Sequence, residues 1–203
     1  MGLVVFAAII LYLLISIAVV IGAIIYARKH GKSAKRWGAG AALIMYLLVF
    51  WDHIPTLVAH KYYCEKEAGF WVYKTLDQWK AENPGAVETL VANKDAPSNR
   101  QGDMTNYIDT YFLNQRFNWV VKHNGPLLFN RWRHEQEVID AKSGEVLARY
   151  VDFSTAHQQR EAGWSGWKFW LDSGFSGNRY CSGEGRDESS MRQFKNNFRG
   201  AEK

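Results

Sequence analysis

The chain of 203 residues contains only two cysteines, and they do not form a C-x-x-C pair. The absence of that pair excludes the common dithiol redox motif. A Gly-rich phosphate loop and the helical zinc motif H-E-x-x-H are also absent. The sequence therefore predicts no catalytic residue, no cofactor and no metal ligand. These absences favour a non-enzymatic role, although they leave enzymatic activity open.

Charge is missing from Leu3 to Tyr26, a run of apolar residues near the start of the chain. At about 1.5 Å per residue, a helix of this length crosses a hydrocarbon core of about 30 Å. A cleavable signal peptide would need a basic segment before a shorter apolar run, and only Met1 and Gly2 precede this one. We therefore expect a membrane-spanning helix over about residues 3–26.

A second apolar segment begins at Trp37 and stays uncharged as far as Trp51. Asp52 and His53 interrupt it, and apolar character resumes as far as Ala59. We expect a second span over about residues 37–59, with a kink from Pro55, which removes a backbone donor. Small residues near its start, Gly38 and Gly40 among them, would let the two helices approach closely.

The loop 27–36 between the two spans is basic and contains no acidic residue. Basic loops stay in the cytoplasm, so both the N-terminus and the C-terminal domain are expected in the periplasm of a bacterial cell, with the protein in the inner membrane. The cations that set this topology are Arg28, Lys29, Lys32, Lys35 and Arg36.

Asp52 and His53 form a candidate polar site at the membrane boundary. Ionisable groups near a membrane core are costly and often functional, so a proton or ion path is one interpretation. The other places both residues at the headgroup level, where they redirect the end of the helix. We favour the second, because the uncharged run before them is nearly long enough to reach the headgroups.

Positive charge is concentrated in the loop. The chain has 25 Lys and Arg residues, of which 20 lie after residue 60, and 20 acidic residues, of which 19 lie after residue 60. The part after residue 60 therefore carries a net charge of about +1. A near-neutral domain has no electrostatic footprint for nucleic acid. The expected partners are the lipid bilayer and a protein in the membrane or periplasm.

Cys64 and Cys181 both fall on the side of the membrane where thiols oxidise and stay paired. We therefore expect a disulfide between them, which closes a long loop of the outer domain.

The predicted fold class is a membrane-anchored α+β protein, in which two transmembrane helices precede one antiparallel β-sheet domain with a short helix. This periplasmic domain is assigned to residues 61–185, and the polar residues 186–203 are expected to form a flexible tail. Aromatic residues should dominate its core.

Local patterns predict the elements of this domain. Thr75 and Gln78 have the spacing of a capping box, and the helix they begin should end by Asn83. Residues 138–147 read as two strands around a bulged turn. Further predictions are strands at 70–74, 127–140 and 164–172, a turn at Asn124–Gly125–Pro126, and a loop over residues 93–106.

Two near-motifs carry weak chemical signals. Ser165 lies in Gly163–Trp167, which lacks the second glycine of a nucleophile elbow. His134, Glu135 and Glu137 hold metal-ligand types, but on a strand the histidine faces away from both acids. We interpret that stretch as a solvent-exposed polar strand face.

Two stretches, Trp51–Pro55 and Tyr63–Thr75, resemble uncharacterised proteobacterial membrane-anchored proteins. In these proteins an apolar segment precedes a Cys-x-x-Glu-Ala-Gly stretch, which is Cys64–Gly69 here, and a hairpin of the type Asp140–Glu145 follows. The resemblance implies a bacterial source and a shared outer domain, and it carries no activity.

These observations predict an inner-membrane accessory or binding protein that presents a disulfide-closed periplasmic domain to a partner. The alternative is a periplasmic enzyme or a small transport-complex subunit that uses Asp52 and His53.

Overall fold

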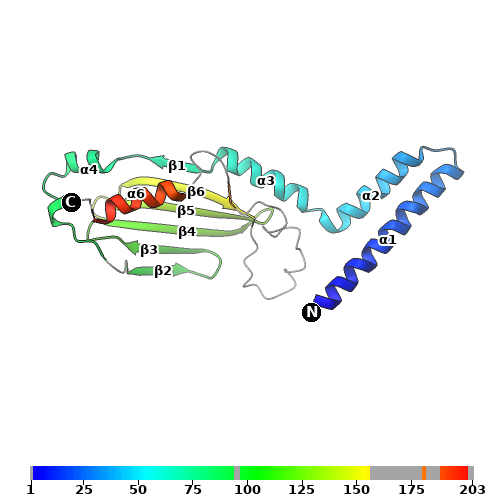
Figure 1. Cartoon of the computed structure of the whole chain (residues 1–203), viewed down its shortest axis with the longest axis horizontal. Helices are drawn as coiled ribbons and strands as arrows, with labels where there is room; N and C mark the ends of the chain where they lie inside the picture. The colour runs from blue at the N-terminus through cyan, green and yellow to red at the C-terminus, as the bar shows by residue number, and fades with distance from the viewer. Residues whose placement is uncertain (1, 94–96, 156–179, 182–187, 201–203) are drawn as a thin grey trace. The chain divides into compact units, whose positions relative to one another are not determined.

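A computed structural model describes residues 2–93, 97–155, 180–181 and 188–200 (Figure 1). The described residues divide into two compact units. The first runs as far as Pro55, and the second contains the described residues from Thr56 onward. The architecture is α+β, with N-terminal helices, a six-stranded antiparallel sheet and a C-terminal helix.

The first unit is a hairpin of two helices, α1 (Gly2–Lys29) and α2 (Ala34–Phe50), which lie side by side (Figure 1). The Tyr12 hydroxyl donates to the Met45 carbonyl across the pair. Gly38 is at the closest approach, because an added Cβ there would lie 2.9 Å from Ile24 Cγ1. No neighbouring atom would crowd a Cβ at Gly40, so of the two glycines only Gly38 serves the close packing that the sequence predicts.

The second predicted span is not one continuous helix. It breaks at Trp51 and Asp52, and α3 (His53–Lys66) follows. Pro55 explains the break, because its missing N–H and its ring deny a helical hydrogen bond to the carbonyl of Trp51. In the first turn of α3 that missing donor costs nothing. Among the described helices α1 alone is long and apolar enough to cross a membrane, and α2 with α3 adds a second candidate only if the bent pair counts as one span.

The second unit is built on a sheet with the strand order β1-β6-β5-β4-β3-β2, in which all neighbours are antiparallel (Figure 1). The predicted antiparallel sheet is therefore confirmed. Its strands are β1 (Gly69–Val72), β2 (Ser98–Gly102), β3 (Tyr107–Phe112), β4 (Phe117–Leu127), β5 (Arg131–Asp140) and β6 (Val146–Ser154).

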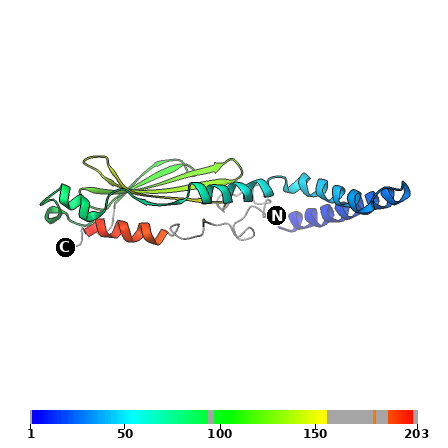
Figure 2. The same ribbon diagram turned by 90° about the horizontal axis from the view of Figure 1, so that it is seen from above.

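The C-terminal region contains helix α6 (Glu188–Gly200) where the sequence analysis expects a flexible tail over 186–203. That expectation is wrong for the helical part. Met191, Phe194 and Phe198 recur at helical spacing and give the polar segment one apolar stripe. The stripe packs on one face of the sheet, where Met191 and Phe198 are fully buried against Phe117 (Figure 2).

Two local predictions are confirmed. Thr75 caps α4 (Leu76–Glu82) with a complete capping box to Gln78. The 138–147 hairpin joins β5 to β6, with Gly144 at φ 74° in its turn. The same core cluster includes Trp79 of α4, in agreement with the predicted aromatic core.

Two other local predictions are wrong. Residues 124–126 lie inside β4 rather than in a turn, and the reversal falls at Leu128–Asn130. Gly125 is there because the Trp132 ring packs on it, so that an added Cβ would lie 2.6 Å from Cε3. The predicted loop 93–106 contains β2, an exposed edge strand that is held by backbone pairing and so needs no apolar side chains. The predicted strand 164–172 lies outside the described residues.

Candidate functional site

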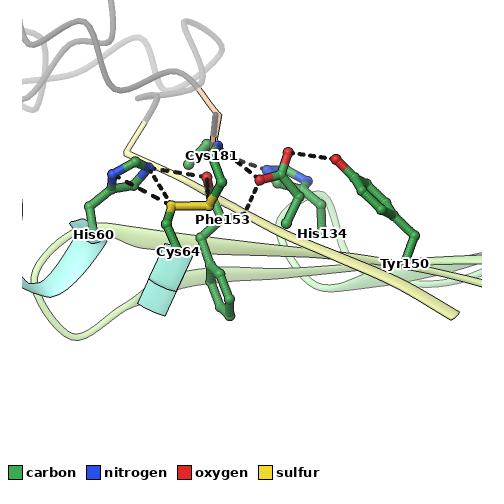
Figure 3. The surroundings of a disulfide bond; sticks show 8 residues. His60, Cys64, His134, Tyr150, Phe153 and Cys181 are labelled. Carbon is green, nitrogen blue, oxygen red and sulfur yellow. Dashed lines mark hydrogen bonds between the residues drawn. A yellow bond between two sulfur atoms is a disulfide. The ribbon is translucent and has the colours of Figure 1, made fainter. Parts of the chain in front are cut away.

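Chemically distinctive side chains gather at the C-terminal end of β6, where the strand places alternate residues on opposite faces. Phe153 points toward α3, whereas Asp152 and Ser154 point to the face that carries His134. Cys64 of α3 and Cys181 are joined by a disulfide beside Phe153 (Figure 3). The predicted pairing of the two cysteines is thus confirmed.

His60 lies one helical turn before Cys64 on α3, and both side chains are buried. The His60 Nε2 atom is 3.2 Å from the Phe153 carbonyl oxygen and 3.5 Å from Cys64 Sγ, while Nδ1 is 3.8 Å from the same sulfur (Figure 3). The ligand atoms of His60, Cys64 and Cys181 all lie within 4.8 Å of one another.

The other face of β6 carries a chain of hydrogen bonds through two histidines. Ser154 Oγ is 2.9 Å from His134 Nε2, and His134 Nδ1 is 2.7 Å from His123 Nδ1. Burial, together with the smaller effect of a positive charge on His123, lowers the pKa of His134 to about 4. Burial also lowers the pKa of His123. Both rings are therefore neutral at pH 7.

Asp152 is the cross-strand partner of His134 and also contacts the backbone of Cys181. Its Oδ1 accepts hydrogen bonds from the backbone N–H of Cys181 at 3.0 Å and of Phe153 at 2.7 Å, and its Oδ2 accepts from the Tyr150 hydroxyl (Figure 3). Burial raises the pKa of Asp152 despite these donors. The carboxyl thus fixes Cys181 against the end of the sheet.

Folding stability should depend on His134 at acid pH. The folded pKa of about 4 lies below the unfolded value of about 6.5, so the unfolded chain binds more protons between these limits. Stability is therefore complete above about pH 6.5 and falls as the pH drops toward 4, by at most about 3 kcal/mol from this residue. His123 acts in the same direction, and Asp152, with its raised pKa, acts in the opposite one.

The measurement is the free energy of unfolding in urea of the full-length protein in detergent, at pH 7 and at pH 4.5, for the wild type and for His134→Gln. The variant should lose less stability between the two pH values, because glutamine does not titrate. An equal loss in both proteins would contradict the assignment.

The sequence predicts that the polar residues of β5 are exposed to solvent. For the two acids of this strand that prediction is wrong, because Glu135 and Glu137 are buried. They are covered by cations, with Glu135 bound to Arg133 at 2.9 Å and to Arg149 at 2.8 Å, and Glu137 bound to Lys122 at 2.6 Å. Burial opposes ionisation of Glu135, but these cations outweigh it and lower its pKa. We call these five residues, Lys122, Arg133, Glu135, Glu137 and Arg149, the charged face. His134 points to the other face, as the strand pattern predicts.

The predicted membrane-boundary residues lie at the helix break. Asp52 is 5% exposed, and His53 begins α3 with its Nδ1 2.8 Å from the Tyr46 hydroxyl. Of the topology cations, Arg28 and Lys29 end α1, Lys32 lies in the turn with its Nζ 4.7 Å from the Trp37 ring centre, and Lys35 and Arg36 begin α2. Ser165 and its near-motif lie outside the described residues.

Neither a family model, nor a curated protein, nor a solved structure matches the chain. The resemblance to proteobacterial membrane-anchored proteins remains a prediction. What the fold defines is a class: an α+β protein with an apolar N-terminal helix, which indicates a membrane anchor or a signal sequence, and a disulfide-bonded domain, which indicates an extracytoplasmic location.

Sequence reasoning missed His60, His123 and Asp152. The spacing of four between His60 and Cys64 was a usable signal, because on a helix it places both side chains on one face. The pairing of His123 with His134 follows from the β4–β5 register, which the wrongly placed turn at 124–126 concealed.

Proposed function

We propose that the protein is an inner-membrane accessory or binding protein of a bacterial cell, whose sheet domain lies in the periplasm and binds a partner in the membrane or periplasm. The disulfide supports the location of the domain in an oxidising compartment, and the long apolar helix α1 supports a membrane anchor. In this proposal α1 contains the first span, and the second runs through the helix break over about residues 37–59. The turn between α1 and α2 is cytoplasmic, and the N-terminus is periplasmic.

The observation that carries the binding role is the charged face. Its two carboxylates are buried, whereas the side chains of Lys122, Arg133 and Arg149 remain 31–35% exposed. The three cations are held in place by the acids beneath them and exceed them by one charge. Helix α6 packs on the opposite face of the sheet, so it does not cover this array (Figure 2). Cys64 of α3 packs beside the array, on Val151 and Phe153 of the same face.

Pre-positioned arginine and lysine groups favour a partner with acidic residues, because little side-chain freedom is lost when they bind. Arginine is also enriched among the residues that dominate interface energies. We therefore assign the charged face as the surface for an acidic segment of a membrane or periplasmic protein.

A photo-crosslinking amino acid at Thr110 tests this assignment. Thr110 on β3 pairs with Val120, which pairs with Glu137, so it lies on the same side of the sheet as the charged face. The matched control is Gln193, exposed on α6 at the opposite face. In intact cells Thr110 should yield one protein adduct, identified by mass spectrometry, that Gln193 does not yield. An adduct from Gln193 alone, or none from either position, would contradict the proposal.

The alternative, a periplasmic enzyme or small transport-complex subunit, is favoured by one observation. Asp52 is buried at the helix break, beside the hydrogen bond between His53 and Tyr46. Transport or turnover abolished by Asp52→Asn, with unchanged crosslinking from Thr110, would select this alternative.

A further inference from the structure

We propose that reduction of the Cys64–Cys181 disulfide opens a site for a thiophilic divalent cation such as Zn²⁺, with His60, Cys64 and Cys181 as its ligands. The proposal goes beyond the binding role of the charged face and does not depend on it. Two thiolates and one imidazole form a Cys₂His donor set, which zinc takes when its fourth position is left to water.

The distance between His60 and Cys64 already fits a bound metal. With Zn–S of about 2.3 Å and Zn–N of about 2.1 Å, two ligands on a tetrahedral ion lie about 3.6 Å apart. The His60 Nδ1 atom is 3.8 Å from Cys64 Sγ. The same sulfur is 3.5 Å from Nε2 and so lies off the direction of the Nδ1 lone pair. An ion bound to both residues therefore requires the imidazole to turn until Nδ1 faces Cys64 Sγ, while the helix backbone stays in place.

The hydrogen bond of the imidazole identifies Nδ1 as the ligand atom. The His60 Nε2 atom faces the Phe153 carbonyl oxygen at 3.2 Å, so the ring proton lies on Nε2, where it donates to that carbonyl. This leaves the Nδ1 lone pair for a ligand. Metal-binding histidines almost always donate their other ring N–H to a carboxylate, a backbone carbonyl or water, and here that support exists without the metal.

The third ligand requires the disulfide to open. A dithiol reductant supplies two electrons and two protons, is itself oxidised to a disulfide, and converts the Cys64–Cys181 bond into two thiols. The two sulfur atoms then separate to about 3.8 Å, the span of two thiolates on one tetrahedral ion. Cys181 stays nearby, because its backbone N–H is bound to Asp152 at 3.0 Å. Binding of Zn²⁺ releases the two thiol protons to solvent.

All three ligands are enclosed. His60, Cys64 and Cys181 are each less than 10% exposed, and Cys64 and Cys181 pack with Val151 and Phe153. Two buried thiolates without a counter-charge would be costly. A divalent cation therefore stabilises this buried pair more than it would stabilise an exposed pair. Either the disulfide or a bound metal ion can therefore join α3 to the chain at Cys181.

The test uses the full-length protein in detergent, either oxidised or reduced with a phosphine, which takes up one oxygen atom from water. Zn²⁺ is titrated against a chromophoric chelator, and Co²⁺ reports thiolate ligation through a charge-transfer band. The reduced wild type should bind one Zn²⁺ and the oxidised protein none. In the reduced state His60→Ala should weaken binding at least about 100-fold. The control His30→Ala, at an exposed histidine of the α1–α2 turn, should leave the affinity unchanged.

Circular dichroism of oxidised His60→Ala and His60→Gln verifies that both variants fold while the disulfide holds the domain. If reduction loosens the domain, Zn²⁺ should restore the aromatic signal of the wild type but not of either variant. The absence of binding to the reduced wild type, or equal affinity in the His60 variants, would overturn the proposal. Equal affinity for the reduced chain in urea would overturn it as well.

Discussion

Replacement of both Cys64 and Cys181 with serine should lower the free energy of unfolding of the sheet domain by about 5 kcal/mol. The bond joins residues 117 positions apart, and the chain-entropy model assigns about this value to a closed loop of that length. The loop spans every strand of the sheet, from β1 to β6, so the unfolded ensemble loses most of its freedom when the bond is present.

Urea unfolding of the full-length protein in detergent, followed by tryptophan fluorescence, measures this loss. A chelator keeps the thiol-containing samples free of metal. The reduced wild type serves as the matched control and should unfold at nearly the same urea concentration as the double variant, since both lack the bond. A loss below about 1 kcal/mol in the variant would show that the domain is held by its core and not by the cross-link.

The sequence could predict the elements whose signals are local. The capping box at Thr75 and Gln78 depends on residues three apart, and the β5–β6 hairpin depends on a turn around Gly144. The pairing of the two cysteines could be predicted without structural information, because the chain contains no other cysteine. The cap and the hairpin are determined by residues a few positions apart, and the disulfide by the number of cysteines.

Predictions failed where distant packing decides the structure. The local pattern places Gly125 in a turn, but the residue lies in β4, where it allows close contact with Trp132 of the neighbouring strand β5. The apolar stripe of α6 is diluted by polar neighbours and gains its stability only against Phe117 and the core. The site beside the disulfide depends on β6, which brings Phe153 and Asp152 to Cys181 from 28 or more positions away.

Replacement of Arg116 with methionine should cost about 3 kcal/mol, because it leaves the buried carboxylate of Asp140 without its cation. The guanidinium donates twice to Asp140, at 2.6 and 2.8 Å, and Trp79 Nε1 donates to the same carboxylate at 3.0 Å. Burial would raise the pKa of Asp140, but Arg116 and these donors lower it to about 2. The charged carboxylate ties β5 to α4 and to the start of β4.

The matched control is Lys61→Met, which removes a cation 3.9 Å from Glu65 in a pair whose side chains are 78% and 53% exposed. Such exposed pairs contribute below about 1 kcal/mol, so urea unfolding should barely change. Comparing the two variants distinguishes the effect of breaking a buried charge pair from the effect of removing a cation in general.

The pH dependence of the Arg116→Met effect identifies its cause. A folded pKa below the unfolded value of about 3.8 gives stability that is present above that value and lost as the pH falls toward 2. The difference in unfolding free energy between wild type and Arg116→Met should therefore be largest at pH 7 and shrink between pH 4 and pH 2, as Asp140 accepts a proton. In the double variant Arg116→Met with Asp140→Asn, the neutral amide removes the buried charge, so part of the lost stability should return at pH 7. If the cost of Arg116→Met is the same at pH 7 and pH 2.5, lost packing of the arginine side chain on Trp79 explains it and the charge pair does not.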